Sequence, residues 1–379
     1  MRNRIPRQLF ALAGLTALSG MLLLTGCDPK KGSESATKPT DAPAVTTGEK
    51  PADSTPKESG KPAEIAGAPK YKVVTNGISP FWTAMSKGLY QGDIDLKVNG
   101  DWQAPDPDTN AAQVKVIQDT LAAKSDGIAV SVIEADALVS TINDAIKQGV
   151  PVITFDSDSE KSKRLCYLGT NNFEAGRAAG LAALKLYPNG GKLVAFVGNM
   201  SAQNARDRFN GFKEALKGTK LEFIREPYED NKDTSIARKN VEDAITKYGT
   251  QVTGLVGLYS YNGPAIIHAV QAAGVRDKTK IICFDGEPET LASLGKGDVD
   301  VTVVQKPYEF GRLSIMLLNL LHKDKTFEKA IEEMQPELDK LGMKVDKTKH
   351  VIDTGVDVIT PTNAKEFLDK LKARGLQST

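Results

Sequence analysis

Two stretches decide the fold: Pro151-Val152-Ile153-Thr154-Phe155-Asp156-Ser157 and Lys280-Ile281-Ile282-Cys283-Phe284-Asp285-Gly286. Each is an apolar run rich in β-branched residues that ends in Phe-Asp and then a small residue. A short apolar run without polar alternation is typical of a strand buried on both faces of a parallel sheet. Because the pattern occurs twice, we expect two units of similar design.

Strand and helix patterns alternate through the rest of the chain. Apolar β-branched runs lie at 72–75, 127–132, 151–155, 192–197, 254–258, 280–284 and 301–304. Amphipathic helical patterns lie at 109–123, 135–148, 173–186, 204–216 and 235–248. This alternation predicts parallel sheets covered by helices on both faces. The number of predicted strands is too large for a single sheet. We therefore predict an α/β fold with two doubly wound parallel-sheet lobes, which the length of 379 residues also favours.

The N-terminus predicts an export signal. Arg2, Arg4 and Arg7 precede an apolar run over 9–24 that is too short and too rich in small residues for a membrane-spanning helix. The run ends in Leu24-Thr25-Gly26-Cys27, which resembles the lipobox of bacterial lipoproteins. The resemblance implies cleavage before Cys27 and diacylation of its sulfur. We predict a lipoprotein signal peptide at 1–26; a plain secretory signal or an anchored helix is the alternative.

A tether is predicted to follow the signal. Between Asp28 and Pro69 the chain contains seven prolines, with no aromatic residue and no Leu. Such a composition buries too little apolar surface to offset the entropy of ordering. We therefore expect residues 27–69 to form a disordered, lipid-anchored linker, whose ends would lie on the order of 35 Å apart as a coil.

The charge balance gives no support for nucleic acid as a partner. Cleavage before Cys27 removes three of 49 basic residues and none of the 48 acidic ones, which leaves a net charge of about −2. No basic block provides the electrostatic footprint that a phosphate backbone requires. The other thiols, Cys166 and Cys283, lie in apolar stretches and are expected to be buried. Their redox state stays open, because two such cysteines define no disulfide framework.

The strand ends carry residues that suit a neutral, hydroxylated ligand. Ligands of open α/β sheets bind beyond the carboxyl ends of the strands, where Asp156 and Asp285 stand. Helix capping is the alternative role for either residue, but the matched pair favours ligand contact. Ser79-Pro80-Phe81-Trp82 follows the first strand, and Asn76-Gly77 turns the loop tightly. Flat rings suit the C–H faces of a sugar, although we expect one of the two rings to pack in the core.

From about residue 71 to 323 the sequence resembles the type I periplasmic binding proteins, especially the ribose-binding-like group. The resemblance depends on the order of five motifs, each of which is weak alone. They are Pro80-Phe81-Trp82, residues 151–156, Ala205-Arg206-Asp207-Arg208-Phe209-Asn210-Gly211-Phe212, Ile282-Cys283-Phe284-Asp285-Gly286 and Val303-Val304-Gln305-Lys306-Pro307. The family fold implies two lobes joined by a three-strand hinge, with a sugar bound between them.

The resemblance also implies ligand-contacting residues in both lobes. They are Ser79, Phe81, Trp82 and Asp156 in the first lobe, and Arg208 and Asp285 in the second, with Gln305 beside a crossover. A carboxylate accepts bonds from two vicinal hydroxyls, and a guanidinium donates a matching fork. Arg208 would also partly neutralise Asp156 and Asp285. Taken alone, Arg208 would fit a surface ion pair with Asp207 or Glu214.

Three positions depart from the ribose-binding pattern. Such relatives usually have Asn at the position of Ser79, Arg at that of Ser157 and Asn at that of Tyr259. We expect Asn76, Tyr259 and Asn262 to complete the site, with Asn262 as donor and acceptor and a tyrosine ring as a wall. A pentose, a hexose or a similar polyol is therefore the expected ligand, whereas ribose in particular is not indicated.

The implied hinge fixes the domain boundaries. The three crossovers are expected near Thr170-Asn171-Asn172, near Gln305-Lys306-Pro307 and at 351–354. The first lobe then comprises 70–171 and 306–330, and the second comprises 172–305 and 350–379. The segment 323–349 is charged, helical in pattern and longer than expected for the group, and we assign it no function.

These features predict the solute-binding component of an ABC-type sugar importer, which closes about its hinge on the ligand. The expected partners are the sugar, the membrane permease and the lipid anchor on Cys27. We expect a monomer at the extracytoplasmic face of a membrane in the cell envelope. A sugar-sensing receptor for a chemotaxis or two-component partner is the alternative.

Other classes of protein fit less well. An enzyme is not expected, because the chain has no Gly-x-Ser-x-Gly motif and no Walker A loop, and His268, His322 and His350 are scattered. For the same reason we expect no cofactor and no metal ion. A transcription regulator would need a DNA-binding headpiece where this chain has a lipobox.

Overall fold

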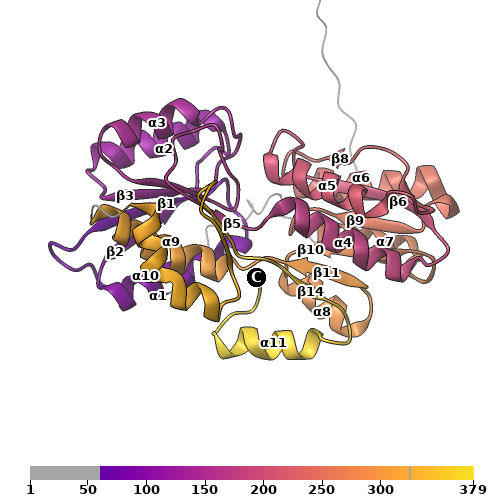
Figure 1. Ribbon diagram of the computed structural model, residues 1–379. Helices are drawn as coiled ribbons and strands as arrows, with labels where there is room; N and C mark the ends of the chain where they lie inside the picture. The colour runs from indigo at the N-terminus through magenta and orange to yellow at the C-terminus, as the bar shows by residue number, and fades with distance from the viewer. Residues whose placement is uncertain (1–59, 324–325) are drawn as a thin grey trace, which may run out of the picture. The chain divides into compact units, whose positions relative to one another are not determined.

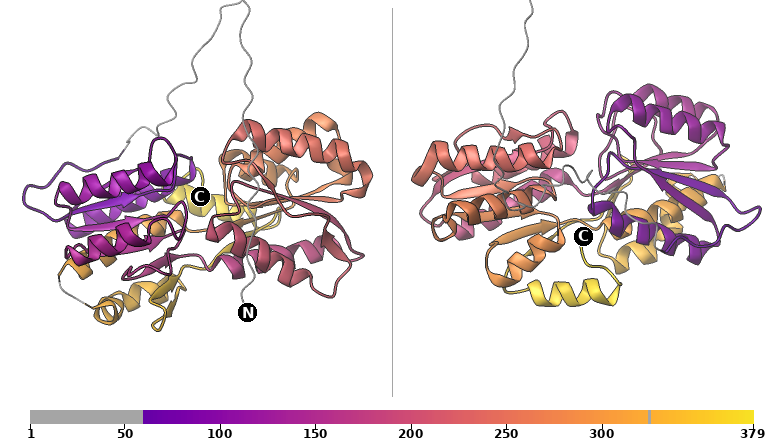
Figure 2. Two further views of the ribbon diagram at one scale, coloured as in Figure 1. Left: turned by 90° about the horizontal axis from the view of Figure 1, so that it is seen from above. Right: turned by 180° about the vertical axis from the view of Figure 1, so that it is seen from behind.

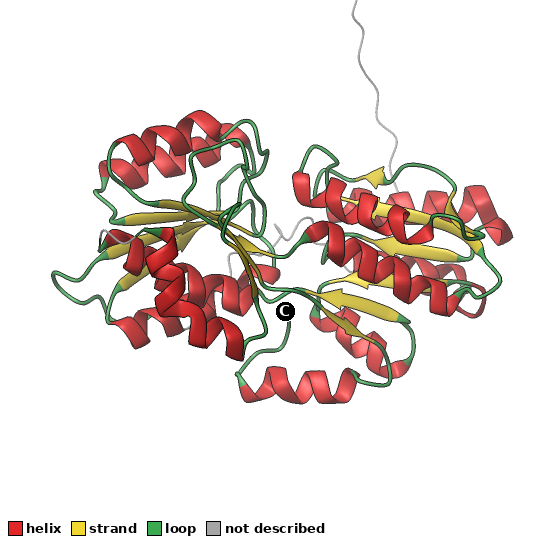
Figure 3. Cartoon of the chain, viewed as in Figure 1, coloured by secondary structure: helices red, strands yellow, loops and turns green. Residues whose placement is uncertain are grey.

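The chain forms two mainly parallel sheets. The computed structural model describes residues 60–323 and 326–379 (Figure 1). Within these residues each sheet has seven strands, and helices cover both of its faces (Figures 2 and 3). The predicted α/β fold with two doubly wound lobes is therefore confirmed. The predicted signal peptide at 1–26, the predicted lipidation at Cys27 and the predicted linker up to residue 59 lie outside the described residues.

The first sheet has the strand order β12-β13-β5-β4-β3-β1-β2. Its strands are β1 (Lys70–Val74), β2 (Asn99–Gln103), β3 (Gly127–Val130), β4 (Val152–Phe155), β5 (Tyr167–Gly169), β12 (Lys344–Asp346) and β13 (Val351–Asp353). Neighbouring strands pair in parallel except β12 with β13. Two helices pack on one face, α2 (Asn110–Ala122) and α3 (Val139–Lys147), and three on the other, α1 (Phe81–Leu96), α9 (Pro307–His322) and α10 (Phe327–Lys340).

The second sheet has the order β14-β11-β10-β9-β6-β7, with β8 also paired to β6. Its strands are β6 (Gly191–Val197), β7 (Leu221–Phe223), β8 (Tyr228–Glu229), β9 (Gly254–Gly257), β10 (Lys280–Phe284), β11 (Val301–Val304) and β14 (Asp357–Ile359). Its helices are α4 (Asn172–Leu186), α5 (Gln203–Leu216), α6 (Thr234–Tyr248), α7 (Asn262–Ala273), α8 (Pro288–Lys296) and α11 (Ala364–Ala373), with short 3-10 turns η1 (Gly249–Gln251) and η2 (Arg276–Lys278). The core residues of α4 and α5 lie on one face and those of α6 and α7 on the other.

Direct backbone packing joins α1 to α9. A Cβ atom on Gly88 would lie 1.8 Å from the carbonyl oxygen of Tyr308, and one on Gly311 would lie 2.0 Å from that of Met85. No side chain fits at either position, so glycine is required for this close approach. Because α1 follows the β1 loop and α9 follows a crossover, the contact ties these two segments together.

The chain passes between the sheets at three places. These lie between β5 and α4, between β11 and α9, and between β13 and β14. The expected boundary at 350 differs from the structure, because β13 pairs with β5 in the first sheet. The segment 323–349, for which the sequence suggested no role, supplies α10 and β12 to the first lobe. In α10, Phe327, Ile331 and Met334 are buried in the core of that lobe.

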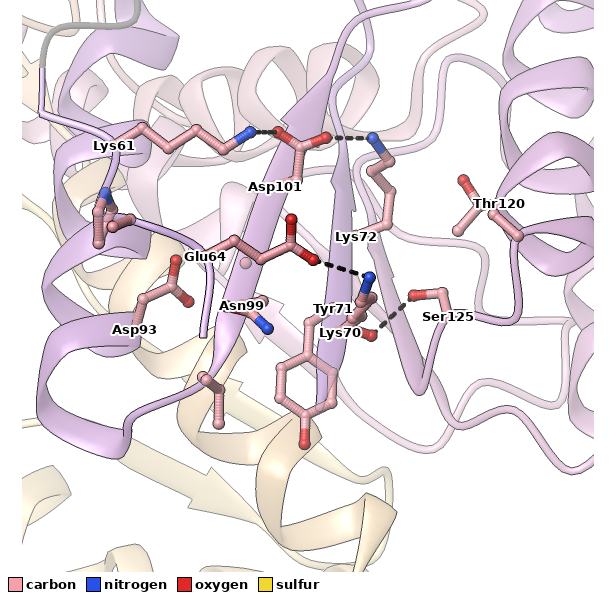
Figure 4. A pocket seen from close by; sticks show the side chains of 15 residues that line it. Lys61, Glu64, Lys70, Tyr71, Lys72, Asp93, Asn99, Asp101, Thr120 and Ser125 are labelled. Atoms are coloured by element: carbon pink, nitrogen blue, oxygen red, sulfur yellow. Dashed lines mark hydrogen bonds and ion pairs between the residues drawn. The ribbon is translucent and has the colours of Figure 1, made fainter. Parts of the chain in front are cut away.

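Residues 60–69 pack along β2, whereas the sequence predicted a disordered linker up to residue 69 (Figure 4). The Ile65 N–H donates to Asn99 Oδ1 and the Asn99 amide donates to Ile65 O, both at 2.8 Å. Lys61 Nζ lies 2.7 Å from Asp101 Oδ1. The prediction of disorder is wrong for 60–69, because one side chain of β2 pairs both backbone groups of Ile65. Composition alone does not reveal such a contact.

The two thiols expected to be buried are buried. Cys166 lies in the core of the first lobe and Cys283 in that of the second, and both are free. Across residues 60–323 and 326–379, none of the helices combines the length and apolar character that crossing a membrane requires.

A buried carboxylate lies beneath the segment 60–69. Asp93 on α1 lines a pocket of about 300 Å³ whose wall includes Lys61 and Glu64 (Figure 4). Asp93 is 2% exposed, and its Oδ1 has no hydrogen-bond partner among the described residues. Burial raises the pKa of Asp93 to about 7, although the Gly100 N–H and the charge of Lys61 lower it. The folded protein therefore holds a proton on Asp93 at pH values where the unfolded chain has lost it.

We expect Asp93→Asn to stabilise the protein at pH 8. Because the pKa of Asp93 is raised from 3.8 to about 7 in the folded state, the free energy of unfolding falls as the pH rises between these values. The neutral amide removes this loss. The melting temperature of the variant should exceed that of the wild type by a few degrees at pH 8 and by much less at pH 4. An equal gain at both pH values would contradict the role of ionisation.

Candidate functional site

The two Phe-Asp motifs occupy equivalent positions in the two lobes. Asp156 directly follows β4, and Asp285 directly follows β10. Both have a left-handed backbone, with φ of 58° and 63°, which Asp adopts more readily than most residues. Neither residue caps a helix, because α4 is capped by Asn171 and α8 begins after Glu287. The capping alternative is therefore wrong for both.

The loops at the carboxyl ends of both sheets line one cavity of about 210 Å³. Nine of the ten expected ligand-contacting residues line it: Asn76, Ser79, Phe81, Trp82, Asp156, Arg208, Tyr259, Asp285 and Gln305. The tenth, Asn262, does not. Six polar residues that the sequence analysis did not select also line it: Asp108, Asn204, Lys232, Thr234, Ser260 and Tyr261. The strand-end rule would have found Asp108 and Lys232 had β2 and β8, which precede them, been recognised as strands.

Asp156 is the first of two buried carboxylates in the cavity. Its Oδ2 accepts a hydrogen bond from Ser131 Oγ at 2.7 Å and a longer one from Asn76 Nδ2 at 3.4 Å. Desolvation raises the pKa of Asp156 to about 6. The Ser131 bond and the positive charge of Arg208 lower it, whereas the negative charge of Asp285 raises it. The carboxylate is therefore mainly ionised at neutral pH.

Arg208 on α5 balances the second carboxylate. Its Nη1 lies 3.8 Å from Asp285 Oδ2, and both side chains are nearly inaccessible. The guanidinium is held from two further sides, because Nε donates to Asn172 Oδ1 at 2.9 Å and Nη1 donates to Leu258 O at 2.8 Å. The guanidinium carbon Cζ of Arg208 lies 4.8 Å from the ring centre of Phe284. Desolvation raises the pKa of Asp285, and Arg208 opposes that shift. The surface ion pair considered for Arg208 is excluded by its burial.

Two rings form the apolar wall of the cavity. Phe81 and Trp82 begin α1 and meet edge to face with ring centres 4.8 Å apart. Trp82 also packs on Phe155, at 5.8 Å, and Phe81 packs on Phe310, at 6.5 Å. We expected one of the two rings to lie in the core. Both are buried in the core of the first lobe, and both also line the cavity.

The loop after β9 shapes the wall in the second lobe. Tyr259 Oη donates to Asn204 Oδ1 at 2.9 Å. Asn262 is fully buried behind this wall, where its Oδ1 accepts from the Tyr259 N–H at 3.0 Å and its Nδ2 donates to Asp230 Oδ2 at 2.9 Å. The expected contact of Asn262 with a ligand is therefore replaced by support of the loop. Tyr261 Oη donates to the same carboxylate, Asp230, at 2.6 Å.

Gln305 leaves one acceptor without a partner. Its Nε2 donates to Asp285 Oδ1 at 3.0 Å, while its buried Oε1 accepts no hydrogen bond from the described residues. A buried acceptor without a donor is costly, so a ligand that donates here would be stabilised. Within the described residues no group of three His, Cys, Asp or Glu side chains could hold a metal ion. The arrangement suits a ligand with several hydroxyl donors.

Comparison with known proteins identifies the family. Residues 72–326 match the family described as periplasmic binding protein domain. This match spans more than half of the chain, so the chain belongs to this family, and the resemblance predicted from the sequence motifs is confirmed.

The particular relatives are proteins that bind sugars. The xylose/arabinose-binding protein of Sulfolobus acidocaldarius is 21% identical over 96% of this chain and 87% of its own length. The ribose import binding protein of Escherichia coli is 23% identical over 63% of this chain and 79% of its own length. A solved ABC transporter solute-binding protein of Burkholderia graminis, in complex with D-arabinose, is 26% identical, with a TM-score of 0.69, over 79% of this chain and 98% of that one.

We expect Arg208→Met to destabilise the protein more at pH 8 than at pH 4. Arg208 lowers the pKa of Asp156 and of Asp285, so its loss raises both, and the free energy of unfolding of the variant then falls more steeply with rising pH. Leaving a buried charge unpaired costs on the order of 3 kcal/mol. Urea unfolding at the two pH values measures the difference.

A second substitution provides the control for this experiment. Adding Asp285→Asn to Arg208→Met removes the unpaired charge and should recover part of the loss at pH 8. If the loss were independent of pH and the double variant recovered nothing, Arg208 would act through packing on Phe284 and not through charge.

Proposed function

We propose that this chain is the solute-binding component of an ABC-type sugar importer and captures a monosaccharide in the cavity between its lobes. The observation that carries the proposal is the burial of Asp156, Arg208 and Asp285 together at the carboxyl ends of two parallel sheets. The sugar-binding relatives support the same function.

The polar groups of the cavity complement sugar hydroxyls. Asp156, Asp285 and the Oε1 of Gln305, which has no donor among the described residues, can accept hydrogen bonds, and a hydroxyl donates one while still accepting another. Arg208 donates hydrogen bonds, which the hydroxyl oxygens of a sugar can accept. Charge-assisted bonds of this kind are roughly twice as strong as neutral ones. The apolar surface of Phe81 and Trp82 suits the C–H groups of a sugar ring.

The size of the cavity favours one sugar unit. Its volume of about 210 Å³ is below the roughly 300–1,000 Å³ of pockets for drug-sized ligands. A pentose, a hexose or a similar polyol is the proposed ligand. Ser79 and Tyr259, at two positions where ribose-binding relatives usually have Asn, argue for a sugar other than ribose.

The proposed mode of action is capture, presentation and release without chemical change. Both lobes contribute ligand contacts, so a bound sugar stabilises the closed arrangement about the three crossovers. A lipid on Cys27 would hold the protein at the extracytoplasmic face of the membrane, where the permease accepts the sugar. Asp156 and Asp285 serve as hydrogen-bond acceptors and not as catalytic acids.

We expect a sugar to raise the melting temperature and loss of either carboxylate to weaken binding. A ligand present at ~100 times its dissociation constant adds about 2.7 kcal/mol to the free energy of unfolding. A thermal-shift panel of pentoses, hexoses and inositols, run on ligand-free protein, identifies the sugar. Asp156→Ala and Asp285→Ala should then each raise its dissociation constant at least tenfold, because each lost charge-assisted bond costs about 1.5 to 3 kcal/mol.

Asp277→Ala is the matched control for this titration, because Asp277 is an exposed carboxylate of the second lobe. It should bind the sugar like the wild type. No response of the wild type to any member of the panel would count against a sugar site. Unchanged affinity in both cleft variants would show that the two carboxylates do not contact the ligand.

We expect Cys27→Ser to abolish lipidation. Acylation requires the thiol at this position, so the variant should accumulate as an unlipidated precursor. Mass spectrometry of the N-terminal peptide and fractionation of membranes measure the outcome. Normal processing and acylation of the variant would contradict the lipoprotein assignment.

A further inference from the structure

The side chain of Lys232 in the second lobe reaches the first lobe beside the cavity. Lys232 lies in the turn between β8 and α6 of the second lobe. Its Nζ donates to the carbonyl oxygen of Asn76 at 2.7 Å and lies 2.9 Å and 3.1 Å from the two carboxylate oxygens of Asp108. Asn76 and Asp108 both belong to loops of the first lobe. The side chains of Lys232 and Asp108 are 28% and 34% exposed, so the ion pair stands at the mouth of the cavity.

The turn that carries Lys232 is held in an unusual conformation. Asn231 and Lys232 both have left-handed backbones, with φ of 52° and 66°. A left-handed backbone is unfavourable for a residue with a side chain, so it persists where the surroundings fix it. Here the Lys232 N–H donates to Asp230 Oδ1 at 2.8 Å, and the Asn231 N–H donates to Gly198 O at 2.7 Å. Asp230 is itself fixed by Tyr261 and Asn262, as described above.

The receiving surface in the first lobe is shaped to match. Asp108 follows β2, and its Oδ2 would lie only 2.7 Å from a Cβ atom on Gly77. The absence of a side chain at Gly77 therefore lets the carboxylate rest on the loop that contains Asn76. The Asn76 side chain in turn donates to Asp156 Oδ2 at 3.4 Å. One loop thus contacts Lys232 through its backbone and the ligand-binding carboxylate Asp156 through a side chain.

We propose that Lys232 is a positioning residue that latches the closed cleft through Asp108 and Asn76 and so sets how long a bound sugar is retained. The inference rests on the proposed function, because retention has meaning only if the cavity holds a ligand. Lys232 belongs to the second lobe and the three oxygens that it contacts belong to the first lobe, so these contacts hold the two lobes together. Because the pair is partly exposed, its contribution should be modest and screened by salt.

The experiment compares Lys232→Met, Asp108→Asn and the exchanged pair Lys232→Glu with Asp108→Lys. The probe is D-arabinose if the wild type binds it, and otherwise the panel sugar with the largest thermal shift. Stopped-flow Trp fluorescence gives the rate of dissociation at 20 mM and 1 M NaCl. Lys239→Met is the matched control, because Lys239 lies on α6 of the same lobe and pairs with Asp243 on the surface.

Each single variant should release the sugar about three to ten times faster than the wild type at low salt, with a smaller ratio at 1 M NaCl. The exchanged pair should recover part of that loss, although the bond to Asn76 is not restored. Lys239→Met should dissociate like the wild type. Wild-type dissociation rates in both single variants would overturn the proposal. So would a loss that is independent of salt and not reduced in the exchanged pair, because it would indicate a local structural role.

A ligand-free measurement separates the latch from the sugar site. If no sugar binds the wild type, the proposed function fails and small-angle scattering at 20 mM NaCl decides the question of the latch. Lys232→Met should then have a larger radius of gyration than the wild type and Lys239→Met, because the lobes would separate more readily without the contacts of Lys232. Identical scattering of the three proteins would show that Lys232 does not hold the lobes together.

Discussion

The burial of one guanidinium together with two carboxylates is the constraint on which the rest of the site depends. Isolated charges in a protein interior cost several kcal/mol each, and Arg208 offsets part of that cost for Asp156 and Asp285. To do so it must be fixed, and the structure fixes it through Asn172 at the start of α4 and Leu258 after β9. The hydrogen bonds of Arg208 therefore link α5, the start of α4 after the first crossover and the end of β9.

The balance is incomplete. Two carboxylates outnumber one guanidinium, and desolvation raises the pKa of both. Ser131 and Asn76 of the first lobe donate hydrogen bonds to Asp156, whereas the Oε1 of Gln305 in the second lobe has no donor among the described residues. The cavity is thus rich in acceptors, and a ligand with many hydroxyl donors completes it better than a ligand that carries its own negative charge.

The sequence predicts most of this site because the strand ends follow a simple pattern. Apolar runs into Phe-Asp place Asp156 and Asp285 correctly, and nine of the ten selected residues line the cavity. Asn262 was assigned wrongly because a polar side chain after a strand serves a ligand or the loop equally well, and only packing distinguishes the two. Asp108 and Lys232 were missed because β2 and the two-residue β8 lack a strong apolar pattern. Neither the Asn99 contacts of residues 60–69 nor the pairing of β13 with β5 has a local signal, because each depends on partners distant in the sequence.

The close contact of α1 with α9 also constrains how the proposed hinge could move the cleft. Phe81 and Trp82 stand at the start of α1, and α9 begins two residues after Gln305, at the second crossover. Gly88 and Gly311 bring the two helix backbones together without intervening side chains, so one helix has little freedom to slide along the other. Rotation at that crossover would therefore carry the aromatic wall as a rigid body with α9. A change in the angle between the lobes would then also move Phe81 and Trp82 relative to a bound sugar. A side chain introduced at Gly88 or Gly311 would separate the two helices and uncouple these two movements.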